Sequence, residues 1–211
     1  WQEVIGTRPI ACSDPGFYSP PGPIPQVGAL FLPATEALSP EVEAFLSVGP
    51  PPVYVGFGSM SIPNPEVTTP RLVAAVRKAG ARVLVSRGWA GLLGAGDDQT
   101  LFLGPEPHGK LFPSCAAVIH HGGAGTTDAA ARAGVPQIVM AQILDQHYWA
   151  DRMPRAGIGF SVARHDRDLP GLARAVHACL TDEALKARAK SFSAAMKTDG
   201  VARTVALLTQ G

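Results

Sequence analysis

From Val53 onward, short apolar runs alternate with longer amphipathic segments, and this alternation restricts the fold more than any other feature of the chain. The runs typical of buried strands are VYVGF, ARVLVS, TLFLG, AAVIH, PQIVM and IGFSV. Segments typical of helices are 70–80, 123–133, 145–157, 169–180, 182–197 and 200–209, with a helical turn near 109–113. Strands that alternate with helices form βαβ units, whose right-handed crossovers build a parallel sheet covered on both faces. The expected fold class is therefore α/β, a Rossmann-like doubly wound parallel sheet.

Proline divides the chain into two parts. Residues 1–52 contain SPPGPIPQVG and GPPP, and the missing amide donors of these prolines favour extended connections. One short helix is expected in this part, with Ser39 as its N-cap and Pro40 at its first helical position. We therefore interpret residues 1–52 as an entry or linker segment and residues 53–211 as the α/β domain.

The composition is that of a globular protein without a strongly charged surface. The 211 residues are 46% hydrophobic and 17% charged, and the net charge is +1. No basic block is present, so nucleic acid is not an expected partner. Three widely spaced cysteines predict reduced thiols. The apolar stretches are too short to span a bilayer and the first residues do not resemble a signal peptide, so we expect a cytoplasmic protein without integral membrane contact.

The stretch VIHHGGAGTTDAAARAG, residues 118–134, joins an apolar strand to an Ala-rich helix. Its glycines let the backbone approach a ligand closely. A helix that begins at such a turn directs free N–H groups and its positive dipole end toward the sheet edge, which favours phosphate. His121 and the hydroxyl of Thr126 or Thr127 are further candidate donors. The alternative is an ordinary strand–helix turn with a histidine packed on the sheet.

Other phosphate and metal motifs do not fit this chain. A P-loop needs a lysine after its last glycine, and GGAGTT has none. The dinucleotide fingerprint would have to be GFGSMS, where Ser61 replaces the last glycine, so a dinucleotide oxidoreductase is disfavoured. The hydrolase elbow G-x-S-x-G is absent. His120 and His121 are strand neighbours that point to opposite faces, which does not suit a shared zinc ion.

Loops after the other strands should line the same crevice, because the carboxyl ends of parallel strands converge at one edge. Gly58 and Ser59 in GFGSM either add an amide and a hydroxyl to a phosphate site or form an ordinary tight turn. Trp89 in SRGW either stacks on a base or is a core residue. His108 lies in a proline-stiffened loop whose peptide groups suit a pyrimidine edge, or which is purely structural.

Asp145 and Gln146 follow the PQIVM strand, at the start of a helix. Aspartate is a favoured helix cap, so capping is one interpretation of Asp145. The other is that the carboxylate and the amide bind sugar hydroxyls, because both accept hydrogen bonds from O–H groups.

Several of these segments together resemble one family. VYVGFGSM, VLVSRGW, PHGKLFPSCAAVIHHGGAGTT, AARAGVPQIVM and DQHYWADRM are similar to the carboxyl-terminal half of two-domain, GT-B fold glycosyltransferases. The likeness is strongest to bacterial enzymes that decorate glycopeptide and polyketide natural products such as antibiotics. Sterol glucosyltransferases and UDP-glucuronosyltransferases are similar more distantly. The likeness extends from about Pro25 to the end, and HHGGAGTT followed by DQ is its most specific part.

The resemblance implies a site for a nucleotide-diphosphate sugar, with UDP or TDP as the nucleotide. It implies no cofactor and no metal. Asp145 and Gln146 match the family's donor-sugar contacts. The positions that match its nucleotide and diphosphate contacts are Ser59, Trp89, His108, His121, Gly123, Ala124, Gly125 and Thr126.

The resemblance further implies an inverting, metal-independent transfer of the sugar to a hydroxyl of a small-molecule natural product. His121 would stabilise the leaving diphosphate, whereas the acceptor site and the catalytic base would lie in an absent amino-terminal domain. Residues 1–52 would then be the entry from that domain, and the chain alone is expected to be inactive. The alternatives are a non-catalytic nucleotide-sugar binding or regulatory module and half of a nucleotide-sugar epimerase. Ala129, Ala141 and His147 depart from the residues of many relatives and leave the base and the sugar open.

Overall fold

The computed structural model describes residues 8–163 and 169–209. Contacts divide the chain into two compact units, which we call the sheet unit (Ala34–Ser193) and the terminal unit (Trp1–Pro33 with Ala194–Gly211). The sequence interpretation places its boundary between residues 52 and 53 instead. The difference arises because residues 34–52 carry a helix whose Val42 is buried in a core that lies on the sheet.

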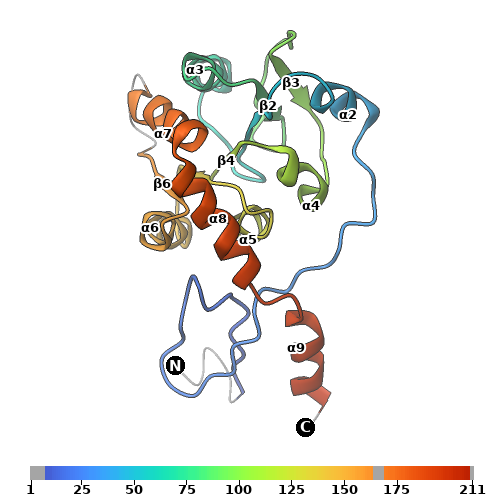
Figure 1. Ribbon diagram of the computed structural model, residues 1–211, viewed down its shortest axis with the longest axis vertical. Helices are drawn as coiled ribbons and strands as arrows, with labels where there is room; N and C mark the ends of the chain where they lie inside the picture. The colour runs from blue at the N-terminus through green and yellow to red at the C-terminus, as the bar shows by residue number, and fades with distance from the viewer. Residues whose placement is uncertain (1–7, 164–168, 210–211) are drawn as a thin grey trace. The chain divides into compact units, whose positions relative to one another are not determined.

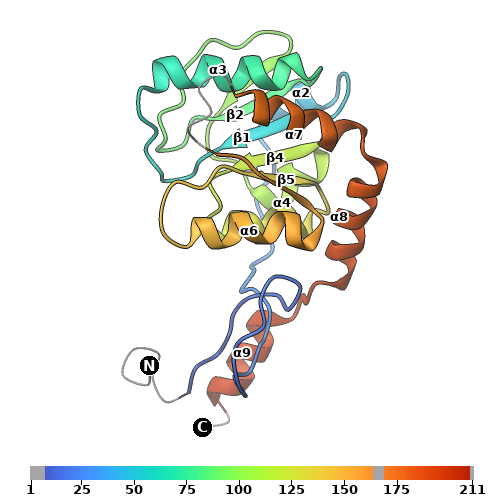
Figure 2. The same ribbon diagram turned by 90° about the vertical axis from the view of Figure 1, so that its left-hand side faces the viewer.

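Among its described residues, the sheet unit contains six parallel strands in the order β3-β2-β1-β4-β5-β6; Figure 1 labels β3 and β6, and Figure 2 labels β2, β1, β4 and β5 between them. The strands are β1 (Val53–Gly56), β2 (Val83–Ser86), β3 (Thr100–Leu103), β4 (Ala117–His120), β5 (Gln137–Val139) and β6 (Gly159–Ser161). Their registers are parallel throughout, for example with Tyr54 opposite Leu84 on one side and Val118 on the other. The α/β, Rossmann-like prediction is confirmed.

Helices cover both faces of this sheet (Figures 1 and 2). Apolar side chains of α3 (Pro65–Lys78) and α7 (Pro170–Thr181) form one core with Val53 and Val55 of β1. The intervening Tyr54 faces the opposite core, with α2 (Pro40–Leu46), α4 (His108–Leu111), the 3-10 turn η1 (Phe112–Ser114) and α5 (Ala124–Arg132). The strands are continuous apolar runs in the sequence because both faces of the sheet are buried.

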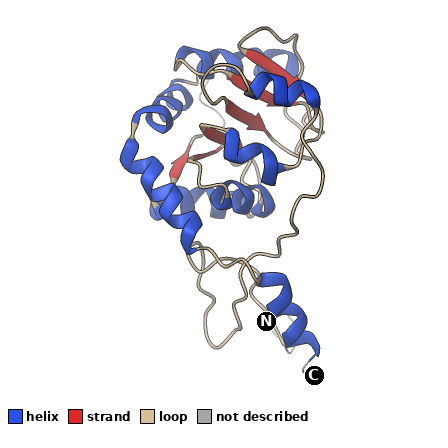
Figure 3. Cartoon of the chain, turned by 45° about the vertical axis from the view of Figure 1, so that its right-hand side comes forward, coloured by secondary structure: helices blue, strands red, loops and turns tan. Residues whose placement is uncertain are grey.

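The remaining helices of the described chain are α6 (Gln146–Ala156), α8 (Glu183–Ala195) and α9 (Gly200–Thr209), shown with the strands in Figure 3. Helix α3 begins at Pro65, five residues before the predicted start at residue 70, so that prediction was wrong. Proline is tolerated at the first helical position because its amide would have no partner there. The helix continues through Pro70. The other elements lie close to their predicted positions.

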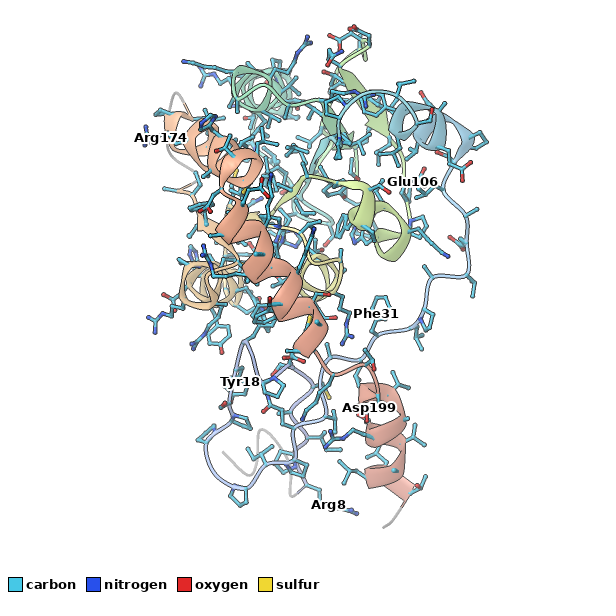
Figure 4. The ribbon with its side chains drawn as sticks, viewed as in Figure 1. Arg8, Tyr18, Phe31, Glu106, Arg174 and Asp199 are labelled. Atoms are coloured by element: carbon cyan, nitrogen blue, oxygen red, sulfur yellow. The ribbon has the colours of Figure 1, made fainter. Side chains whose placement is uncertain are left out.

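The segment before β1, residues 34–52, is anchored to the rest of the sheet unit by two side chains. The amide of Ser39 donates to Oε2 of Glu106 at 3.1 Å; Glu106 is labelled in Figure 4 on the loop between β3 and α4. Arg82, only 3% exposed, donates to the carbonyls of Phe45 at 2.8 Å and of Val48, and its guanidinium lies 3.7 Å from the ring centroid of Phe45. A buried cation thus caps the carboxyl end of α2, where carbonyls lack helical partners.

The terminal unit is held by hydrogen bonds between its two segments. The amide of Lys197 donates to Oδ2 of Asp14 at 2.9 Å, and its Nζ donates to the carbonyl of Gln26 at 2.9 Å. Arg8 donates to the carbonyl of Leu207 in α9 at 3.3 Å.

Within the ranges that the structure describes, no helix combines the length and apolar character needed to span a membrane.

We expect Arg82→Ala to lower the free energy of unfolding by about 2 kcal/mol, because it removes a buried guanidinium that donates to the carbonyls of Phe45 and Val48 at the end of α2. The measurement is urea unfolding followed by circular dichroism. Arg77→Ala is the control, since Arg77 pairs with Asp97 at an exposed position where an ion pair contributes at most about 1 kcal/mol. Equal losses for the two variants would show that Arg82 does not anchor α2.

Candidate functional site

The strand order reverses between β1 and β4. From β1 the chain proceeds outward through β2 to β3, then returns to β4 and proceeds through β5 to β6 on the other side. The helices that follow these two central strands, α3 and α5, therefore pack on opposite faces. A crevice opens at such a reversal, beyond the carboxyl ends of the strands, and this is where open α/β sheets bind ligands. The loops after β1 and β4 both contain candidate residues.

A buried hydrogen-bond chain fixes the turn after β4. The amide of Gly122 donates to Nδ1 of His120 at 3.1 Å, so Nε2 carries the imidazole proton and donates to Oε1 of Gln137 at 2.9 Å. Nε2 of Gln137 in turn donates to the carbonyl of Thr127 in α5 at 3.1 Å. Burial lowers the pKa of His120 to about 3, so the imidazole is neutral. This network, which we call the His120 chain, ties β4 and β5 to the first turn of α5.

His121 points the other way, into the loops at the sheet edge. Its ring lies against two glycines: a Cβ on Gly58 would come 3.0 Å from Cε1, and one on Gly123 would come 2.5 Å from Nε2. Any side chain at Gly123 would therefore displace the imidazole. Nδ1 of His121 is buried and has no hydrogen-bond partner within the described residues. Burial lowers the pKa of His121, and the Asp145 carboxylate opposes this effect.

The amino end of α5 faces the same place. Its first helical hydrogen bond runs from the Thr127 amide to the carbonyl of the N-cap residue Gly123, at 2.9 Å. The amides of Ala124, Gly125 and Thr126 precede this ladder and have no helical acceptor. Ala124 and Gly125 are exposed, and the N-cap residue, Gly123, has no side chain that could cap the helix. The hydroxyl of Thr127 is used internally, since it donates to the carbonyl of Gly123 at 3.0 Å, which leaves Thr126 as the candidate hydroxyl.

Loops after the other strands meet this turn. The Trp89 amide donates to the carbonyl of Gly58 at 3.1 Å, which joins the loops after β2 and β1. The side chain of Trp89 is 84% exposed, so the core-residue interpretation was wrong. Ser59 is also exposed. His108 stacks on Phe112 with ring centroids 4.3 Å apart; burial lowers its pKa, and the neighbouring His121 lowers it further.

Asp145 and Gln146 occupy different environments. Asp145 is exposed at the N-cap of α6, and its side chain makes no capping hydrogen bond, so the capping interpretation was wrong. Gln146 is 5% exposed, and its Oε1 accepts the amides of Gln142 at 2.9 Å and Ile143 at 3.2 Å. The Gln146 side chain therefore shapes the loop after β5. Its contact with a sugar stays a prediction, as do the roles of the other candidate residues.

Two buried polar residues that support the site were missed from the sequence. Gln137 interrupts the apolar run PQIVM, and His120 ends the run AAVIH. A polar residue in a strand buried on both faces must find an internal partner, and this was the available signal. In the part of the chain that the structure describes, no three His, Cys, Asp or Glu side chains cluster closely enough to hold a metal ion.

The His120 chain predicts an acid-sensitive fold. The unfolded histidine takes up a proton near pH 6.5, whereas the folded pKa of His120 is about 3, so the unfolded state binds more protons between these values. The free energy of unfolding should therefore fall as the pH drops, by about 2 kcal/mol more for the wild type than for His120→Asn between pH 7 and pH 5. Urea unfolding at the two pH values measures this difference. Equal losses of the free energy of unfolding in the wild type and in His120→Asn would contradict a neutral His120 imidazole.

Comparison with known proteins shows which proteins this chain is similar to. Vancomycin aglycone glucosyltransferase of Amycolatopsis orientalis is 46% identical over 187 residues, which cover 87% of this chain and 44% of the relative. Sterol 3-beta-glucosyltransferase UGT80A2 of Arabidopsis thaliana is 37% identical over 185 residues, 85% of this chain and 29% of the relative. The solved glycosyltransferase SnogD from Streptomyces nogalater superposes with a TM-score of 0.72 at 22% identity, over 96% of this chain and 57% of its own.

The chain thus spans less than half of the length of these two curated relatives. Residues 102–208, just over half of the chain, match the family described as "Erythromycin biosynthesis protein CIII-like, C-terminal domain". The resemblance to natural-product and sterol glycosyltransferases, noted from the motifs, is confirmed. The chain belongs to the family of erythromycin biosynthesis protein CIII-like carboxyl-terminal domains.

Proposed function

We propose that this chain is the donor-binding half of a glycosyltransferase and that it holds a nucleotide-diphosphate sugar, with UDP or TDP, in the crevice between the ends of β1 and β4. The observation that carries the proposal is the amino end of α5, whose first amides lie beside the His121 ring at the reversal of strand order. Amides without helical partners and the positive end of the helix dipole favour a diphosphate at this position.

The other loops supply the remaining parts of such a site. Trp89 presents a largely exposed indole suited to stacking on a base, and the loop with His108 lies next to it at the sheet edge. Asp145 presents a carboxylate that accepts hydroxyl donors, near enough to His121 to raise its pKa. The diphosphate would thus lie between a base and a sugar. The glucosyltransferase names of the similar proteins agree with a sugar donor.

The proposed reaction is an inverting displacement. The oxygen of an acceptor hydroxyl attacks the anomeric carbon while the bond from that carbon to the diphosphate oxygen breaks, and the electron pair leaves with the diphosphate. A base in the amino-terminal half takes the hydroxyl proton. The α5 amides and a neutral His121 N–H stabilise the charge that grows on the diphosphate, and this requires no metal. The acceptor is a small natural product bound mainly by the amino-terminal half.

Gly125 allows a charge test of this site. A Cβ at Gly125 meets no atom within 4 Å, so the position accepts other residues. We expect Gly125→Asp to weaken binding of UDP and TDP by about ten-fold or more, because it puts a carboxylate where the diphosphate lies. The same carboxylate should leave stability unchanged or raise it by about 0.5 kcal/mol, because acidic residues favour a helix amino end.

Isothermal titration calorimetry on the full chain measures this affinity, and Gly125→Asn is the matched neutral control. Binding should fall much less in the asparagine variant, whose side chain has the same shape without the charge. If the wild type binds neither nucleotide, or if aspartate and asparagine behave alike, the α5 site is wrong.

His121→Ala tests the transition-state role. In the enzyme assembled with an amino-terminal half, we expect kcat to fall by about 100-fold while the Kd for the nucleotide sugar rises much less, because the hydrogen bond strengthens as charge develops. Turnover and donor binding are measured on the same preparations. An unchanged kcat would remove His121 from the mechanism. Donor binding without glycoside product in any assembly would favour the non-catalytic module, and release of an epimerised sugar would favour the epimerase.

A further inference from the structure

The carboxylate of Asp145 is turned away from the helix that it precedes. Asp145 is the N-cap of α6, where an aspartate ordinarily accepts a hydrogen bond from an amide of the first turn. Its side chain makes no such bond. Instead, Oδ2 accepts a hydrogen bond from the indole Nε1 of Trp149, one turn further along α6, at 3.2 Å. This hydrogen bond from the Trp149 indole therefore fixes the direction of the Asp145 carboxylate.

The same carboxylate acts on the crevice. Its charge raises the pKa of His121 against the lowering effect of burial. An opposite charge has this effect only at short range. The Asp145 carboxylate therefore accepts a hydrogen bond from the Trp149 indole on its own helix and also acts electrostatically on the imidazole that follows β4.

The loop that delivers Asp145 is itself held in an uncommon conformation. Leu144, the preceding residue, has φ of +51° and is 81% exposed, so a large apolar side chain occupies the left-handed region in solvent. This conformation costs free energy and persists only where surrounding contacts impose it. The Gln146 side chain braces this loop, since its Oε1 accepts the amides of Gln142 and Ile143. Both the backbone and the carboxylate of Asp145 are therefore held in place.

Trp149 is in turn supported by its neighbours on α6. Its ring meets the Tyr148 ring edge-on, with centroids 5.3 Å apart and planes at 87°. The guanidinium of Arg152 lies 4.5 Å from the centroid of Tyr148. The ring contact and the hydrogen bond to Asp145 both restrict the orientation of the indole.

We propose that Trp149 is a positioning residue for the donor sugar: its indole N–H orients the Asp145 carboxylate so that the remaining lone pairs accept hydroxyls of the sugar. Trp149 does not touch the sugar. This inference rests on the proposed function and adds a residue to it. It divides the proposed site into a part that binds the diphosphate, at α5, and a part that binds the sugar, at the amino end of α6.

The test compares nucleotide sugars with the bare nucleotides. Trp149→Phe keeps an aromatic ring and removes the N–H. We expect it to weaken binding of UDP-glucose or TDP-glucose about five-fold, the loss typical of one hydrogen-bonding interaction, and to leave UDP or TDP unchanged. Asp145→Ala should have a similar or larger effect on the sugar nucleotides alone. Calorimetry on the full chain provides the Kd of each protein for UDP, TDP, UDP-glucose and TDP-glucose.

A double-mutant cycle shows whether Trp149 acts through Asp145. In the Asp145→Ala background, Trp149→Phe should have no further effect, because the group that it orients is gone. Independent, additive losses overturn the proposal, and so does an equal loss for UDP and UDP-glucose, which indicates general damage to α6. If the wild type binds neither nucleotide nor nucleotide sugar, the proposed function itself fails.

NMR provides a readout that does not depend on the folding of Trp149→Phe. In the wild-type protein labelled with 15N, the indole N–H resonance of Trp149 should move when UDP-glucose or TDP-glucose is added and move much less with UDP or TDP. Asp145→Ala should remove this selective response. A Trp149 resonance that responds equally to nucleotide and nucleotide sugar contradicts the assignment.

Discussion

The His120 chain is the interaction on which the candidate site depends. Three hydrogen bonds connect the Gly122 amide, the His120 ring, the Gln137 amide group and the Thr127 carbonyl. They join the two strands β4 and β5 to the helix α5 in the interior, where each lost partner leaves a buried polar group unsatisfied. With these elements fixed, His121 is directed to the sheet edge, beside the first amides of α5.

Most of the architecture could be predicted because it depends on patterns along the chain. The apolar runs are buried on both faces, and glycine or proline marks their ends, so the six strands and the parallel topology follow from the sequence. The start of α3 could not be placed in this way. Pro65 and Pro70 are both compatible with a first helical turn, and local rules do not decide between them.

The candidate residues could be predicted as a group, whereas their individual environments could not. Converging strand ends bring the loops after β1, β2 and β4 together, as the contacts among Gly58, Trp89 and His121 show. Whether a tryptophan is exposed or an aspartate caps a helix depends on neighbours that are distant in sequence or one turn away. Sequence spacing also gives Asp145 and Gln146 the same apparent role, although one is exposed and the other is buried in its loop.

The proposed site combines a helix amino end and a carboxylate, whose opposite charges favour different parts of a ligand. At α5 the positive end of the helix dipole and the amides without helical acceptors attract an anion, whereas at α6 the negative Asp145 carboxylate repels a phosphate. The His121 ring lies beside Gly123, the N-cap of α5, and its pKa is subject to opposing effects of burial and of Asp145. A ligand that satisfies both ends must carry its negative charge at one side and hydroxyl donors at the other. A nucleotide-diphosphate sugar has this distribution, and a bare nucleotide or a free sugar has only half of it. Discrimination between these ligands should therefore depend on the separation of the two charges, which the His120 chain and the Gln146-braced loop hold constant.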